Sequence, residues 1–341
     1  MTYQLTENTL VLSQDYELFF HNSGSVENCL LRPTEVLLKF ARRKDICITF
    51  YVDAGMLVSM RHYAETSREV SGMRDQVCRN IEALAAGGHE IGLHVHPHWN
   101  ATRWTDRGWD FSNTRYSPRQ YRAGEFFDIC KSYCEELAEV AGAAITTYRA
   151  GGFCIQPFEH IGEALHALGI YTDSSVVPGM YLNDHDKSFD FRKVPDAPWW
   201  FFDGEATVSA DSGRFLEIPI SSMRLSPFFY WGRALDRLRQ RQPPSVYGDG
   251  LSKAIGKVSA LRRLMALERN VEMSTDGPKA PLLESASRVG NERRLCHIMG
   301  HPKLLSTESL NRLERFIDQH EISRFESVAS LANRVRAGLS F

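Results

Sequence analysis

Short, nearly continuous apolar runs alternate along the chain with longer stretches in which apolar residues recur every three or four positions. Continuous runs of this length predict strands buried on both faces, and the longer periodicity predicts amphipathic helices. The predicted strands are Thr9–Ser13, Ile46–Asp53, Glu90–Val95, Thr146–Arg149, Ile170–Ser174, Phe215–Ile220 and Leu295–Met299. The predicted helices are Pro33–Lys44, Arg68–Ala86, Pro118–Val140, Pro157–Ala167, Thr307–Gln319 and Ser327–Arg336. This alternation predicts an α/β fold with a mainly parallel sheet.

Polar residues gather where the predicted strands end. In a parallel barrel the carboxyl ends of the strands meet at one face, and that face carries the functional site. The residues concerned are Asp15, Glu17, Asp53, His94, His96, His98, Arg149, Asp173 and His301.

The segment GHEIGLHVHPHW, residues 88–99, holds four histidines. A neutral imidazole is a good ligand for zinc-like metals, so the cluster predicts a metal site. His94 and His98 have a spacing that can reach one ion if the chain turns at Pro97, whereas His94 and His96 would share one face of a strand. Two imidazoles need a carboxylate beside them, and Glu17, Asp53 and Asp15 are all candidates.

Hydrolysis at such a metal needs a base and an acid. Water activated by a metal becomes a usable nucleophile near neutral pH, and a neighbouring carboxylate can take its proton. We expect Asp15 to be that base and His301 to protonate the leaving group. Arg149 is expected to form an ion pair with Asp15.

Composition narrows the class of protein. The 341 residues are 43% hydrophobic and 24% charged with a net charge of −2, which is ordinary for a globular protein and points to no nucleic-acid partner. The odd number of widely spaced cysteines predicts reduced thiols. The first residues do not resemble a signal peptide, and no apolar run reaches the length of a membrane span, so we expect a cytoplasmic protein without a transmembrane segment.

One long connection, residues 223–291, separates two predicted strands. Its first part holds ten Arg and Lys against three acidic residues. We interpret it as a helical basic insertion before the last strand, within a single domain of residues 1–341. It either packs on the barrel with a solvated basic face, contacts a second copy of the chain, or cradles a phosphate-bearing or lipid-linked substrate near a membrane surface.

Seven motifs occur in order from about residue 9 to about residue 335: LSQDYE, ITFYVD, GHEIGLHVHPHW, YRAGGF, YTDSSVVPG, FLEIPI and IMGHPK. Together they resemble the polysaccharide deacetylase (NodB-homology) family, carbohydrate esterase family 4. The resemblance implies a distorted (β/α)7 barrel and one divalent metal ion, with zinc expected and cobalt, nickel or iron as alternatives. It also implies removal of an acetyl group from an N- or O-acetylated sugar.

Position by position, the resemblance makes Asp15 the base, His301 the acid and Arg149 the residue that orients the base. Metal ligands would be Glu17, His94 and His98. Two departures from the family pattern keep alternatives open. Asp-Tyr-Glu replaces an adjacent Asp pair, so Asp53 remains an alternative carboxylate, and the sequence HVHPH leaves His96 as an alternative imidazole. Backbone amides between Arg149 and Gly152 would stabilise the oxyanion.

The substrate is expected to contact Trp99, Asp53, His96, Gly151 and Asp173. Because no signal peptide is recognised, we favour a cytoplasmic step in surface polysaccharide or lipopolysaccharide biosynthesis, acting on a nucleotide- or lipid-linked acetylated sugar. Two alternatives remain. One is a metal-independent hydrolase of cyclic amides on the same fold, and the other is a catalytically inactive glycan-binding relative.

Overall fold

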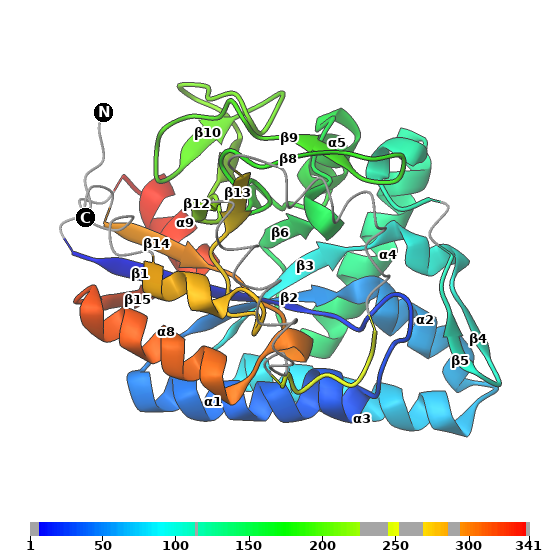
Figure 1. Ribbon diagram of the computed structural model, residues 1–341. Helices are drawn as coiled ribbons and strands as arrows, with labels where there is room; N and C mark the ends of the chain where they lie inside the picture. The colour runs from blue at the N-terminus through cyan, green and yellow to red at the C-terminus, as the bar shows by residue number, and fades with distance from the viewer. Residues whose placement is uncertain (1–6, 113–114, 226–244, 252–268, 286–293, 339–341) are drawn as a thin grey trace.

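The computed structural model describes residues 7–112, 115–225, 245–251, 269–285 and 294–338 (Figure 1). The main sheet comprises β1 Thr9–Tyr16, β2 Ile48–Asp53, β3 Glu90–Val95, β6 Thr147–Ala150, β7 Thr172–Asp173, β10 Trp200–Phe202, β11 Phe215–Glu217, β14 Leu295–Ile298 and β15 Arg324–Glu326. Three two-stranded antiparallel sheets are β4 Arg103–Thr105 with β5 Gly108–Asp110, β8 Tyr181–Asn183 with β9 Ser188–Asp190, and β12 Ser222–Leu225 with β13 Arg269–Glu272. The described α-helices are α1 Arg32–Lys44, α2 Ala54–Ala64, α3 Arg68–Ala86, α4 Ala123–Ala141, α5 Glu159–Ala167, α8 Thr307–Gln319 and α9 Val328–Arg336.

The main sheet is parallel except at one edge and curls into a half-barrel. Its strand order is β10-β11-β7-β6-β3-β2-β1-β14, with β15 also paired to β1 and only β10 running antiparallel to its neighbour. An extended segment after β11 connects the chain that follows β7 with the edge strand β14, because Ile220 N donates to Val176 O and Ser221 N donates to His297 O. The predicted α/β class with a mainly parallel barrel sheet is confirmed, and all seven predicted strands are found in this sheet.

Alternation along the strands separates two environments. On β1, Leu10 and Leu12 pack in the main apolar core, whereas Ser13 and Asp15 point the other way, into the barrel. The same period of two sends Phe50 on β2 to the core and Asp53 to the interior. Because both faces are buried, the strands look continuously apolar in sequence, and their polar members line the barrel.

Helices cover the outside of the sheet. Figure 1 shows α1 and α8 lying side by side, and Glu314 on α8 pairs with Arg43 and Lys44 on α1 at 3.1 Å each. Helix α9 closes the amino-terminal end of the barrel, because Val328 N donates to Thr49 and its apolar side chains join a cluster with strand residues from β1, β2 and β11. The candidate site residues lie at the opposite end of the barrel, where the parallel strands have their carboxyl ends.

Two helices, α4 and α2, differ from the sequence prediction. Helix α4 begins at Ala123 rather than Pro118, because Pro118–Gln120 forms a separate 3₁₀ turn capped by Ser117. Helix α2 was not predicted, since its sequence AGMLVSMRHYA is apolar on most sides and has little amphipathic periodicity.

The predicted helical insertion, residues 223–291, falls largely outside the described residues. At its ends the structure has β12 paired antiparallel with β13, followed by a 3₁₀ segment Ala280–Ser285, so the described parts of this range are not α-helical. Eight of the ten basic residues that suggested a cradle, from Arg233 to Arg263, lie outside the described residues.

All seven cysteines lie in the described residues and none forms a disulfide. No helix among the described residues is both long and apolar enough to span a membrane.

Candidate metal centre

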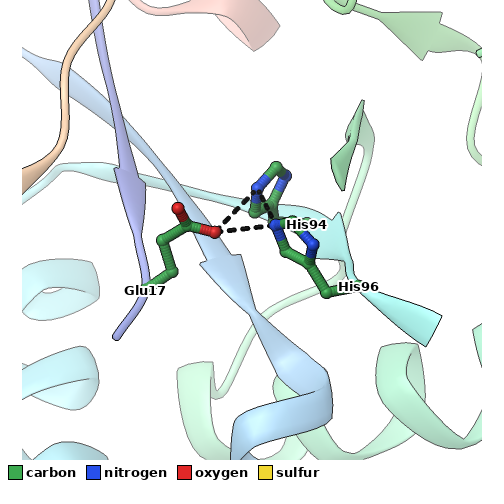
Figure 2. A group of neighbouring side chains, drawn as sticks. All are labelled: Glu17, His94 and His96. Atoms are coloured by element: carbon green, nitrogen blue, oxygen red, sulfur yellow. Dashed lines mark hydrogen bonds and ion pairs between the residues drawn. The ribbon is translucent and has the colours of Figure 1, made fainter. Parts of the chain in front are cut away.

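Three side chains converge at the carboxyl end of the barrel: Glu17, just after β1, His94 on β3 and His96, just after it (Figure 2). Their ligand atoms all lie within 4.8 Å of one another. Glu17 Oε2 is 2.7 Å from His96 Nε2 and 3.4 Å from His94 Nε2, and the two imidazole nitrogens are 3.1 Å apart. All three side chains are buried.

The donor set fits a divalent ion. His94 Nδ1 donates to the carbonyl of Arg149 at 2.9 Å, which fixes the tautomer and leaves Nε2 with its lone pair facing the cluster. Glu17 Oε2 is buried and has no properly oriented hydrogen bond, despite its short distance to His96. One carboxylate and two imidazoles with an orphaned oxygen between them suit zinc or a similar metal.

Electrostatics keep the carboxylate charged. Burial acts to raise the pKa of Glu17, but the Lys303 ammonium and the two imidazoles outweigh it and hold that pKa well below its usual range. Burial likewise opposes protonation of His94, yet Asp15 and Glu17 raise its pKa to about 9, whereas burial lowers the pKa of His96 to about 4. A cation therefore has to displace at most the proton on His94.

His98, which the family resemblance makes a ligand, is not part of this group. The period of two carries His94 and His96 to the barrel interior, but Pro97 then starts a 3₁₀ turn and rotates the next side chain out of phase. The His98 ring stacks on Tyr116 with centroids 5.3 Å apart, and neither of its nitrogens has a hydrogen bond among the described residues. The geometry thus favours the alternative that the sequence left open, His96.

Asp15 and Arg149 form a buried ion pair, as expected. Arg149 NH1 lies 2.7 Å from Asp15 Oδ1, and NH2 donates to Ser13 Oγ at 2.9 Å. Arg149 Nε donates to the carbonyl of Ser174, and its guanidinium lies over the Tyr51 ring. These contacts fix Asp15 so that Oδ2 faces His94 Nε2 at 3.8 Å.

His301 lies on the other side of the same carboxylates. Its Nε2 is 3.6 Å from Glu17 Oε1 and 3.9 Å from Asp15 Oδ2, while Nδ1 is 3.1 Å from Asp276 Oδ1. Burial opposes protonation, but Asp276 outweighs it and raises the pKa of His301. The imidazole therefore carries a proton more readily than a free histidine and is 18% exposed, so it can meet a substrate.

Asp53 and Trp99 bind each other through one carboxylate oxygen, and the other oxygen, Asp53 Oδ1, is buried without a hydrogen bond among the described residues. Trp99 Nε1 donates to Asp53 Oδ2 at 2.5 Å, and the indole is buried, packed against Phe111 and Trp109. A sugar ring therefore finds no exposed Trp99 face. Burial and the charge of Glu17 raise the pKa of Asp53 to about 8.

Two further predicted contact residues lie behind the site. A Cβ on Gly151 would be 2.5 Å from Val95 O and 2.6 Å from His96 Nδ1, so glycine lets the loop after β6 pass the cluster. Asp173 is fully buried and accepts from Ser175 Oγ at 2.6 Å. Burial raises the pKa values of Asp173 and of Glu217, its neighbour on the paired strand β11.

Sequence reasoning missed three residues of the site. Lys303 Nζ binds Glu17 Oε1 at 2.8 Å, Asp276 binds His301, and Tyr116 packs on His96 with centroids 5.4 Å apart. Lys303 lies two positions after His301, the predicted acid, in the motif GHPK, so its position could have drawn attention to it. A lysine at such a position is, however, usually predicted to be a surface residue. Nothing in the sequence around Asp276 or Tyr116 distinguishes them from ordinary turn residues.

No protein-family model matches the sequence, and no curated protein is detectably similar to it. Solved structures do match. A protein from Mycobacterium smegmatis described as a polysaccharide deacetylase is 14% identical, with a TM-score of 0.55 over 99% of this chain and 93% of its own. The Puue allantoinase is 15% identical, with a TM-score of 0.50 over 98% of this chain and 91% of its own.

The Bc1960 peptidoglycan N-acetylglucosamine deacetylase also matches, at 12% identity and a TM-score of 0.42 over 97% of this chain and 90% of its own. The first two overlaps carry the structural argument. They show that the chain has the barrel fold of the polysaccharide deacetylases, as the sequence motifs predict, and identities this low establish the fold alone.

Proposed function

We propose that this protein is a metal-dependent hydrolase that removes an acetyl group from an acetylated sugar. The observation that carries the proposal is the convergence of Glu17, His94 and His96 beside an Asp15–Arg149 pair and a half-buried His301. This set holds a ligand group, a base and an acid at the open end of a barrel with the deacetylase fold.

Glu17, His94 and His96 would hold the ion, and a divalent metal bound there supplies a Lewis acid for the acyl oxygen and lowers the pKa of water. Asp15 takes the proton of the attacking water, because its Oδ2 faces the cluster while Arg149 holds Oδ1. His301 gives its proton to the departing amine or alcohol, and Asp276 keeps the ring oriented with Nε2 toward the site. Amides of Gly151 and Gly152 would donate to the developing oxyanion, as the family resemblance implies.

We further propose that the substrate is an N-acetylated sugar and that the reaction serves glycan assembly. A nucleotide- or lipid-linked sugar is the preferred form. This part of the proposal rests on the sequence-based expectation of a cytoplasmic protein.

Metal analysis of three purified proteins tests the proposal: wild type, His96→Ala and His98→Ala, each incubated with zinc and desalted. We expect about one zinc per chain in the wild type and in His98→Ala, and none in His96→Ala. Acetate release from chitooligosaccharides should follow the zinc content and be abolished in Asp15→Asn. A wild type that binds no zinc, cobalt, nickel or iron, or that keeps full activity in chelator, contradicts the proposal.

A second candidate is metal-free hydrolysis of a cyclic amide. The Lys303 ammonium already compensates Glu17 without an ion, and the Puue allantoinase shares the fold. Hydrolysis of allantoin that persists in chelator, with no acetate released from any sugar, would favour this candidate over the first.

A further inference from the structure

Lys187 lies in the turn of the β8–β9 hairpin, and this hairpin packs against the loop that follows β6. The rings of Phe189 and Phe153 are 6.0 Å apart across that contact. Lys187 Nζ lies 4.1 Å from the centroid of the Tyr116 ring. The side chain of Lys187 is partly buried, and its ammonium lies over the Tyr116 ring.

Tyr116 links this ammonium to the candidate metal centre. Its ring stacks on His98 and packs edge-on against His96, with centroids 5.3 Å and 5.4 Å away. A Cβ on Gly152 would be only 2.9 Å from the Tyr116 hydroxyl. Lys187 is therefore separated from a proposed ligand and from the proposed oxyanion loop by one aromatic ring.

Three acids of the site already have cationic partners. Asp15 pairs with Arg149 at 2.7 Å, Glu17 with Lys303 at 2.8 Å, and Asp276 with His301 at 3.1 Å. On the hairpin itself, Asp186 pairs with His185, and Asp190 pairs with Arg192. Asp184 Oδ1 accepts from His185 N at 2.7 Å, and this carboxylate acts on Lys187 without forming an ion pair with it.

The Lys187 ammonium forms no ion pair or hydrogen bond with any other part of the chain that the structure describes. It contacts the face of Tyr116, and the carboxylates of Glu17 and Asp184 act on it only at longer range. A partly desolvated ammonium without a carboxylate is costly, and a cation–π contact offsets only part of that cost. Burial accordingly lowers the pKa of Lys187. An anion brought by the substrate would supply the missing partner.

We infer that Lys187 determines specificity for an acetylated sugar that also carries an anionic group, a phosphate or a carboxylate, near the acetylated position. The inference rests on the proposed deacetylase function and names its substrate class. A lysine ammonium is a common point-charge partner for phosphate and carboxylate.

The test compares kcat/KM for acetate release from N-acetylglucosamine, N-acetylglucosamine 6-phosphate and N-acetylmuramic acid, using zinc-loaded wild type and Lys187→Met. We expect the wild type to prefer an anionic substrate, the better of the two showing whether phosphate or carboxylate is the natural group. In Lys187→Met that preference should fall by at least about tenfold, the usual effect of one charge-assisted hydrogen bond. Lys193→Met, which removes an exposed lysine from the same region, is the matched control and should keep the preference.

A preference that is equal in wild type and Lys187→Met, or a wild type that prefers the neutral sugar, overturns the inference. Lys187→Gln serves as the second variant if Lys187→Met folds poorly. If no substrate releases acetate, the proposed function fails by itself, and calorimetric binding of N-acetylglucosamine 6-phosphate then decides the inference. Binding weakened about tenfold in the variant supports it, and equal or undetectable binding overturns it.

Discussion

Replacing Arg149 by methionine removes a fully buried cation from the centre of the barrel. The side chain is 0% exposed, and its guanidinium is within 2.7 Å of Asp15 Oδ1 and 2.8 Å of the Ser174 carbonyl. Methionine fills most of the volume but leaves the Asp15 charge buried without its partner. Breaking one side of such a pair costs about 3–5 kcal/mol, which is roughly a 10²- to 10⁴-fold change in the unfolding equilibrium.

The assay is urea unfolding followed by circular dichroism, in chelator so that bound metal does not alter the free energy of unfolding. Lys39→Met, which breaks an exposed ion pair with Glu35 on α1, is the control and should leave the midpoint unchanged. Asp15→Leu combined with Arg149→Met removes both charges and should be less destabilised than the sum of the single variants. A midpoint for Arg149→Met equal to that of the wild type, or strictly additive losses, would refute the reasoning.

Two other predictions concern the site loop and pH. Gly151→Ala should lower the free energy of unfolding by about 1–3 kcal/mol and zinc affinity by about tenfold or more, because the added Cβ meets a carbonyl and His96. Gly72→Ala, whose Cβ meets nothing within 4 Å, is the control in both urea unfolding and zinc titration. Equal behaviour of the two variants would contradict the packing argument. Burial lowers the pKa of His89, whose Nδ1 accepts a hydrogen bond from Ile48 N at 3.2 Å. As pH falls below about 6.5, the unfolded chain therefore takes up a proton at His89 before the folded protein does, and the free energy of unfolding of the wild type should decrease. Between about pH 7.5 and about pH 5.5, the urea midpoint of a His89→Phe protein should decrease less than that of the wild type.

Much of the fold follows from local patterns that the sequence displays openly. The strand Glu90–Val95 and the helices Arg68–Ala86 and Thr307–Gln319 have the predicted bounds, because a continuous apolar run and a regular helical period leave little choice of secondary structure. Helix α2 was missed because burial on most sides erases the periodicity on which such a prediction depends.

The site was predictable as far as strand ends could be located. Asp15, Glu17, His94, Arg149 and His301 come together because parallel strands end at one face. The choice between His96 and His98 depends on where regular alternation stops. Pro97 begins a 3₁₀ turn that takes His98 out of that alternation, and residue spacing does not reveal this backbone geometry. Partners such as Lys303 and Tyr116 depend on tertiary contacts between distant segments, which a single sequence does not encode locally.

The pairing of β1 affects the order in which the protein folds. Its first half bonds to β14 and β15, so nearly the whole length of the chain separates these partners. Contacts of such high sequence separation form slowly, because a large entropy of loop closure precedes them. During synthesis, one edge of β1 stays unpaired until β14 and β15 have been synthesised. Asp15 lies on β1 and His301 comes shortly after β14. The appearance of the assembled site in a refolding experiment would therefore report the pairing of these strands, which is the final folding step.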